Sequence, residues 1–134
     1  MKGKTKLSSK ERALNADQFA LDKKAEGVVI LNITDLSSIA DYLIICSAAS
    51  DRQVQAIASS VEEGLKEKGV RPLSTEGIRE GHWALLDYGD IIAHVFLEPV
   101  REFYNLEGLW PEAPKAELDG MEDAKTLKSK VANL

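Results

Sequence analysis

Three aspartates are the residues best suited to chemistry in this sequence. Asp87 and Asp90 flank a short turn, and Asp41 begins an apolar run further back in the chain. Carboxylates grouped in this way could hold a divalent cation, as a metal-dependent hydrolase or a nucleotidyltransferase requires. The alternative, which we favour, is structural: Asp90 shapes the turn and Asp87 projects from the sheet.

The other reactive side chains lack the spacing of a catalytic or metal site. His82 and His94 are the only histidines, and the single Cys46 lies inside an apolar run. A metal site would need further ligands, so we interpret both histidines as structural, with His94 on the outer face of a hairpin. No base lies near Cys46, which we expect to be a small buried hydrophobe. Phosphate-binding, dinucleotide-binding and nucleophile-elbow motifs are missing too, so we expect no enzyme activity, metal or cofactor.

A third interpretation of the turn is a surface that recognises another protein. Asp87, Tyr88 and Asp90 offer polar groups beside apolar area. Tyrosine, tryptophan and a few charges together are typical of protein interfaces. Trp83 and Phe96 could belong to the same surface. For Trp83, ordinary core packing is an equally good explanation.

These residues lie on a predicted β-hairpin. The apolar runs Trp83–Tyr88 and Ile91–Leu97 flank Gly89-Asp90, and glycine accepts the positive φ that two-residue hairpin turns require. Both faces of the hairpin are largely apolar, so helices should cover one face, and helices or a partner the other. One face pairs Trp83 with Phe96, Leu85 with His94 and Asp87 with Ile92, and the other pairs Ala84 with Val95, Leu86 with Ala93 and Tyr88 with Ile91.

Helices and strands are also predicted on both sides of the hairpin in the sequence. A capping box at Ser8-x-x-Glu11 begins a helix that should run to about Glu26, with Gly27 in the left-handed position after it. Val28–Ile33 and Asp41–Ala48 are continuous apolar runs, typical of buried strands. The later elements are a helix that starts at Ser50-x-x-Gln53 and ends at Gly69, a short strand at Leu73–Thr75, and a short helix that begins at Pro99.

The order of these elements predicts an α/β fold. Asp41–Thr75 is a β-α-β unit, whose two strands should be parallel, and the hairpin adds antiparallel pairs. We therefore expect a mixed β-sheet with helices packed on it, in a single domain over residues 8–110. Residues 1–7 form a frayed basic N-terminus, and residues 111–134 form a C-terminal tail that is partly helical at best.

Length and charge limit the classes of function. The chain has 134 residues, 44% of them hydrophobic and 29% charged, with a net charge of −5, which fits one globular domain. An acidic chain argues against a general nucleic-acid coat and suits a partner with a positive patch. The single cysteine fits a reducing compartment, and neither a secretory signal nor a membrane span is predicted. We therefore expect a cytoplasmic protein.

The hairpin and its neighbours carry a specific combination of motifs. The stretches are D-K-K-A-E-G-V-V-I-L at 22–31, S-S-I-A-D-Y-L-I-I-C-S at 37–47, S-D-R-Q-V at 50–54, E-G at 76–77, W-A-L-L-D-Y-G-D-I-I-A-H-V-F at 83–96 and R-E-F-Y-N-L-E-G-L-W at 101–110. Together they resemble the Iojap family of ribosomal silencing factors, known as RsfS. The resemblance covers about residues 10–110, in order, and leaves the tail outside.

This resemblance implies a fold similar to nucleotidyltransferases without their activity. The Gly-Ser and paired aspartates of such enzymes are indeed missing around Asp41. It also implies binding to the fourteenth protein of the large ribosomal subunit, which blocks joining of the small subunit and represses translation when nutrients are scarce. The family's contact surface corresponds to Trp83, Tyr88 and Asp90, and the free protein is expected to be a homodimer.

We extend this predicted contact surface to neighbouring residues of the hairpin, namely Leu85, Asp87, His94 and Phe96. Two alternatives to the silencing function stay open. The first is a factor for assembly of the large subunit, and the second, less favoured, is the metal-dependent enzyme that the three aspartates could form. We expect neither direct DNA binding nor membrane binding.

Overall fold

A six-stranded mixed sheet forms the centre of the computed structural model, which describes residues 7–116. The strands lie side by side in the order β3-β4-β5-β2-β1-β6. In chain order they are β1 (Glu26–Asn32), β2 (Tyr42–Ala48), β3 (Ser74–Glu76), β4 (Trp83–Asp87), β5 (Ile91–Leu97) and β6 (Lys115–Ala116). The helices are α1 (Ser9–Leu21), α2 (Asp51–Glu67), α3 (Glu98–Tyr104) and the short 3-10 helix η1 (Leu106–Leu109).

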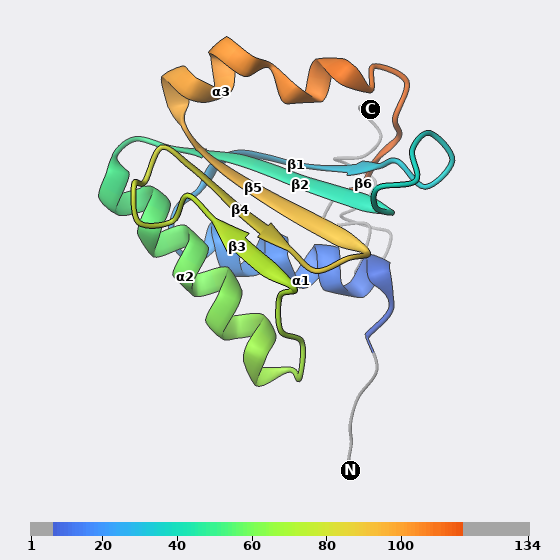
Figure 1. Cartoon of the computed structure of the whole chain (residues 1–134), viewed down its shortest axis with the longest axis horizontal. Helices are drawn as coiled ribbons and strands as arrows, with labels where there is room; N and C mark the ends of the chain where they lie inside the picture. Colours follow the sequence, from blue (N-terminus) through green and yellow to red (C-terminus); the bar gives the residue numbers. More distant parts are fainter. Residues whose placement is uncertain (1–6, 117–134) are drawn as a thin grey trace.

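Helices cover both faces of the sheet, which confirms the predicted α/β class. Figure 1 shows α1 and α2 on one face and α3 on the other. The larger core lies between the sheet and the α1–α2 layer and includes Leu14 and Leu86. A smaller core, which includes Leu31, Ile45 and Phe96, lies on the α3 side. Partly buried side chains of the α3–η1 segment pack against this smaller core.

The hairpin has the predicted register. β4 and β5 pair antiparallel, with Trp83 opposite Phe96 and Asp87 opposite Ile92. Gly89 takes a φ of +92°, the left-handed backbone that the turn needs. Because successive side chains alternate between the two faces of a strand, the odd-numbered residues of β4 lie on the α3 side. The even-numbered residues of β4, and Tyr88 after it, belong to the larger core.

Both predicted helix caps are present, in different forms. At α1 the capping box is complete: the Glu11 N–H donates to Ser8 Oγ at 3.1 Å, and the Ser8 N–H donates to the Glu11 carboxylate at 2.8 Å. At α2 the Gln53 N–H donates to Ser50 Oγ, but Gln53 Oε1 accepts from the Ala49 N–H instead of closing the box. The Gln53 amide nitrogen donates to two carbonyls of the turn after α1, so this side chain ties α2 to that turn.

The first helix ends earlier than predicted. α1 ends at Leu21, and Lys24 takes the left-handed conformation at a φ of +63°. Glu26 already pairs with Ser47 of β2, so pairing in the sheet outweighs the helical preference of these residues. Gly27 is therefore not the helix cap. It lies in β1 at a φ of +57°, where the pairing with β2 is irregular.

β2 and β3 are not neighbours in the sheet, unlike the two strands of a simple β-α-β unit. β2 pairs with β5 in parallel, and β5, β4 and β3 follow in antiparallel pairs. β2 and β3 therefore run in the same direction, as predicted, but β5 and β4 lie between them. The hairpin is thus inserted into the middle of the sheet, which places β5 next to the buried strand β2.

The sheet also extends past the predicted domain boundary at residue 110. β6 pairs antiparallel with β1, with Ile30 opposite Ala116, and the Asn32 N–H donates to the Pro114 carbonyl at 2.9 Å. The outer edge of β1 needs partners for its backbone groups, and a two-residue strand leaves no periodicity in the sequence. The first part of the predicted tail is therefore part of the sheet. The rest of the tail, residues 117–134, and residues 1–6 lie outside the described residues.

Candidate interaction surface

Trp83 lies at the start of β4, on the α3 side of the sheet. Its indole N–H donates a 3.0 Å hydrogen bond to Nδ1 of His94 on β5. Its ring packs against Phe96 and Tyr104, with ring-centroid distances of 4.7 and 4.9 Å. The side chain stays partly exposed. Trp83 thus packs on the smaller core, as one of the two interpretations predicts, and its partial exposure leaves the recognition of another protein a prediction.

His94 is buried beneath Trp83 and is not exposed on the outer face of the hairpin as we expect from the sequence. Only 7% of the residue is exposed, and its ring stacks on Phe96 at a centroid distance of 5.9 Å. Burial lowers the pKa of His94 from 6.5 to about 4, so the ring is neutral at neutral pH. A neutral ring that accepts at Nδ1 carries its proton on Nε2.

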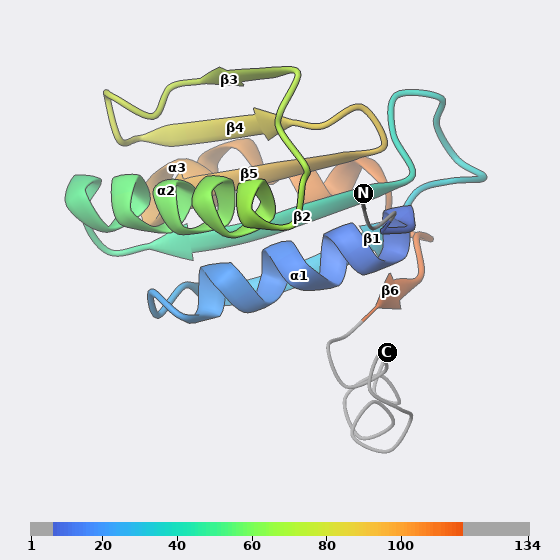
Figure 2. The same cartoon turned by 90° about the horizontal axis from the view of Figure 1, so that it is seen from below.

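Three partly exposed residues continue this face along the hairpin, namely Leu85 and Asp87 on β4 and Ile92 on β5. Asp87 Oδ1 accepts from the Gly89 N–H at 2.8 Å, so the carboxylate shapes the turn and keeps its charge at the edge of the face. Figure 2 shows β4 and β3 extending past α3. Two apolar side chains and a carboxylate, all partly exposed, therefore lie on the same face of the hairpin as Trp83.

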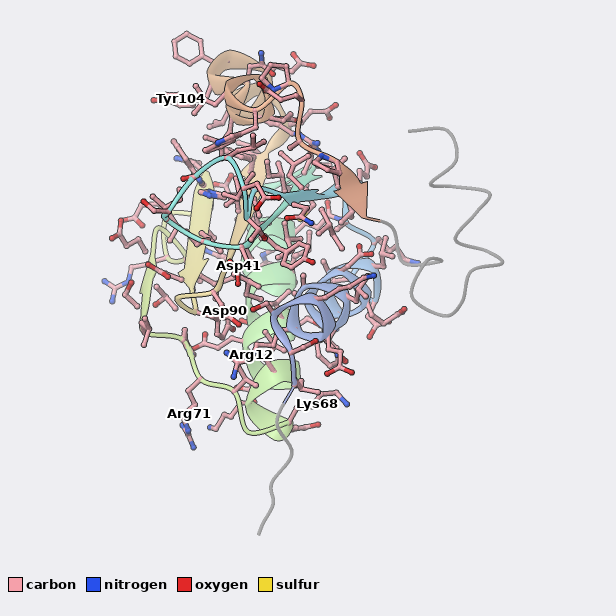
Figure 3. The ribbon with its side chains drawn as sticks, turned by 90° about the vertical axis from the view of Figure 1, so that its right-hand side faces the viewer. Arg12, Asp41, Lys68, Arg71, Asp90 and Tyr104 are labelled. Atoms are coloured by element: carbon pink, nitrogen blue, oxygen red, sulfur yellow. The ribbon has the colours of Figure 1, made fainter. Side chains whose placement is uncertain are left out.

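Tyr104, near the end of α3, belongs to the same surface, although the sequence did not identify it as a site residue. It is 54% exposed, and its ring contacts those of Trp83 and the exposed Phe103. Figure 3 shows Tyr104 on the α3 layer, far from the start of α1. Helical periodicity gave no signal for this contact, which exists only because α3 docks on the sheet. We call Trp83, Leu85, Asp87, Ile92 and Tyr104 the hairpin surface.

Two residues that we predict as partner contacts, Tyr88 and Phe96, are buried. Tyr88 is 5% exposed and belongs to the larger core, on the opposite face of the sheet from Trp83. Burial, and after it the charge of Glu62, raises the pKa of the Tyr88 hydroxyl. Phe96 lies in the smaller core directly against Trp83. Both side chains therefore support the hairpin from within and present no open contact area.

Asp90 lies at the turn end of the hairpin, in a polar cluster with the start of α1. Arg12 Nη1 lies 3.2 Å from Asp90 Oδ1. Ser9 Oγ lies 2.9 Å from Asp90 Oδ2 and 3.0 Å from Asp41 Oδ2, and its single hydroxyl proton can be donated to one of the two carboxylates at a time. The Asp41 N–H also donates to the Asp90 carbonyl at 2.8 Å. Figure 3 shows Arg12, Asp41 and Asp90 together at this end.

This cluster bears on the hypothesis of a metal-dependent enzyme. Asp41 and Asp90 come together, but Asp87 bonds to the turn, and Arg12 supplies the positive charge beside Asp90. Across residues 7–116 no three His, Cys, Asp or Glu side chains are grouped to share a metal ion. The part of the chain that the structure describes therefore gives this hypothesis no support.

The remaining candidates for chemistry lie apart from the hairpin surface. Cys46 is buried in β2, and burial raises the pKa of its thiol to about 12, so it is the small hydrophobe that we predict. His82 is exposed and lies 3.8 Å from a carboxylate oxygen of Asp51 at the start of α2. Among the described helices, none combines the length and the apolar character needed to cross a membrane.

The sequence is similar to those of known proteins over most of its length. Residues 6–133 match a family model described as "Ribosomal silencing factor during starvation", so the match continues past residue 110, where our motifs end. A ribosomal silencing factor from Halalkalibacterium halodurans is 46% identical over 115 residues, which are 86% of this chain and 98% of the relative. The chloroplastic Iojap protein of Arabidopsis thaliana is 35% identical over 106 residues, 79% of this chain and 44% of that protein.

The fold is also similar to that of a solved structure. A crystal structure of a protein from Chromobacterium violaceum superposes with a TM-score of 0.77 and 36% sequence identity, over 78% of this chain and 88% of that one. Sequence and fold therefore agree with the motifs of the hairpin and of α3. The chain belongs to the family of ribosomal silencing factors.

Proposed function

We propose that this protein acts in the cytoplasm, where it binds the large ribosomal subunit through that subunit's fourteenth protein and blocks joining of the small subunit. Translation is thereby repressed under nutrient limitation, which agrees with the family description of silencing during starvation. The mechanism is steric: the bound factor occupies volume that the small subunit needs. The protein then acts as a regulator and performs no catalytic step.

The hairpin surface is the observation that carries this proposal. It places an indole and a phenol beside aliphatic side chains, all at least partly exposed. Tryptophan and tyrosine are enriched among the residues that dominate binding energies at interfaces. Trp83 is already fixed by His94, Phe96 and Tyr104. It therefore loses little conformational freedom on binding, which favours affinity.

The charge of the chain fits a basic partner. The net charge is −5, Asp87 lies on the hairpin surface, and the exposed Glu76 on β3 pairs with Leu85. A ribosomal protein that neutralises RNA phosphates carries an excess of lysine and arginine. Opposite charge raises the rate of encounter, whereas buried aromatic contacts slow dissociation.

Four residues that we predict as contacts act indirectly in this proposal. His94 and Phe96 hold Trp83 in place, and Tyr88 anchors the hairpin to the larger core. Asp90 fixes the turn to α1 through its ion pair with Arg12. The direct contacts are the residues of the hairpin surface.

Sedimentation of purified ribosomal subunits tests the function. The wild-type protein should migrate with the large subunit and lower the fraction of joined ribosomes. Trp83→Ala and Tyr104→Ala should each weaken binding by roughly tenfold or more, as expected for central aromatic contacts. Leu21→Ala is the matched control, because Leu21 is an apolar residue of α1 that is 39% exposed on the opposite side of the sheet.

Two outcomes of this experiment would contradict the proposal in different ways. Migration of the wild-type protein with neither subunit would exclude the silencing function. Unchanged binding of the folded Trp83→Ala and Tyr104→Ala variants would leave the function standing and remove the hairpin surface from it. Tighter binding to precursor particles than to mature large subunits would instead identify an assembly factor.

We also propose that the free protein is a homodimer, since a second copy could cover apolar side chains left exposed on the surface. Sedimentation equilibrium of the full chain at micromolar concentration measures this directly. A monomer under these conditions would contradict the proposal without affecting the ribosomal function.

A further inference from the structure

His94 is a polar residue in an apolar setting. It is one of three buried polar or charged residues in the part of the chain that the structure describes, the others being Asp17 and Ser47. It faces the smaller core beside Phe96. A buried imidazole is unfavourable unless its polar atoms are hydrogen-bonded. The bond from the Trp83 indole N–H to His94 Nδ1 satisfies one of them.

The neighbours of Trp83 constrain its ring in different ways. Phe96 and Tyr104 contact the indole through their own rings, which fix its position but not the direction of its N–H. The indole nitrogen can only donate, so it needs an acceptor. His94 Nδ1, at 3.0 Å, supplies that acceptor from inside the hairpin. This bond therefore determines which edge of the indole faces inward.

We propose that His94 is a positioning residue for partner binding. By accepting the indole N–H it holds the polar edge of Trp83 inward and presents the hydrocarbon edge of the ring to the partner. His94 itself does not touch the partner. The inference rests on the proposed function, because it assigns a role within the same hairpin surface.

Removal of the acceptor should change the surface without removing any surface atom. The indole N–H would be left without a partner beneath the ring, and the ring would turn to reach water. A partner would then meet the polar edge, or its binding would have to turn the ring back. We expect the affinity for the partner to fall by about tenfold, which corresponds to about 1.4 kcal/mol.

Isosteric variants separate the acceptor from the size of the side chain. Asn and Leu have nearly the same shape, but only His94→Asn keeps an acceptor oxygen near the place of Nδ1. His94→Leu removes it. His94→Phe also removes it but keeps a ring that can stack on Phe96, so it serves if the leucine variant does not fold. A merely structural role for His94 could make the Asn and Leu variants differ in stability, but it would not protect the Trp83 indole N–H in His94→Asn alone.

The first measurement uses the free full-length protein and needs no partner. The indole N–H resonances of its two tryptophans are assigned with a Trp110→Phe variant, and their hydrogen exchange is measured by NMR. Exchange at Trp83 should be slow in the wild type and in His94→Asn, and at least tenfold faster in His94→Leu or His94→Phe. Equal exchange in all four proteins would overturn the proposed orientation.

The second measurement is the affinity of each folded variant for purified large ribosomal subunits. His94→Asn should bind more tightly than His94→Leu and His94→Phe. Equal losses for all three would overturn the positioning role, even with wild-type binding intact. If the wild-type protein itself fails to bind, the proposed function and the binding role of His94 are both excluded. The exchange data would then still decide whether His94 orients Trp83.

Discussion

Acidification should destabilise this protein through His94. The pKa of His94 is lowered to about 4 in the folded state by burial, against 6.5 for an ordinary histidine. Between these two pH values the unfolded chain binds a proton that the folded chain excludes, so the free energy of unfolding decreases as the pH falls. The part of the free energy of unfolding that depends on a neutral His94 is fully present above pH 6.5 and is lost as the pH falls to about 4.

The size of the effect follows from the two pKa values. A pKa difference of one is worth about 1.36 kcal/mol, so the interval from 6.5 to about 4 corresponds to roughly 3 kcal/mol when fully expressed. At pH 5.5, where most carboxylates remain ionised, the loss relative to pH 7.5 should be about 1 kcal/mol. Protonation of Nδ1 also removes the acceptor of the Trp83 N–H, so acid should release the indole at the same time.

Urea unfolding at pH 7.5 and 5.5 measures this loss in the wild type and in His94→Phe. The variant lacks the titrating group at position 94 but keeps His82, so the contribution of the exposed His82 cancels in the comparison. The wild type should lose about 1 kcal/mol more than the variant between the two pH values. Equal losses in the two proteins would show that the folded state does not exclude the proton from His94, and the argument from burial would be refuted.

Two substitutions test contacts away from the hairpin surface. Arg12→Gln should lower the free energy of unfolding by at most about 1 kcal/mol, and only at low salt, because the ion pair with Asp90 is partly exposed. Melting temperatures of the wild type and the variant at low and high salt measure this. A loss of stability that does not depend on salt would mean that Arg12 acts through packing instead. Gly27→Ala should destabilise by roughly 1–2 kcal/mol, because a Cβ at φ +57° would lie 2.8 Å from Arg101 Nη1. Gly69→Ala is the matched control, because Gly69 also has a positive φ, +83°, but a Cβ there would meet no neighbouring atom. Urea unfolding measures the loss of stability in both variants. Equal losses for Gly27→Ala and Gly69→Ala would mean that Arg101 moves aside at no cost.

The hairpin could be predicted to its register because the information is local. A Gly-Asp turn fixes the pairing, and alternation then assigns every side chain to a face. The end of α1 could not be predicted in this way. Glu26 and Gly27 follow a helical run, but pairing with β2 recruits them into the sheet. The pairing partner, β2, is distant in the sequence. The residues around Glu26 and Gly27 therefore carry no signal for this pairing.

The candidate site was predictable only in part, for a similar reason. Trp83, Leu85 and Asp87 follow from the hairpin alone, because they share one face of β4. Tyr104 could not be placed beside Trp83, because their contact depends on how α3 docks. The pairing of Asp41 with Asp90 through Ser9 requires three separate segments to meet.

The two faces of the short strand β4 differ, because one packs in the core and the other lies partly at the surface. Ala84 and Leu86 anchor β4 in the larger core beneath α1 and α2, whereas Leu85 and Asp87 lie on the opposite face of β4 and are partly exposed. Substitutions of the outward residues should therefore weaken binding while the fold persists. Trp83 is the exception, since its ring joins the smaller core and the surface. Under the proposed function, stability and binding would be coupled at Trp83, and the hydrogen bond from its indole N–H to the buried His94 is the contact through which we expect that coupling.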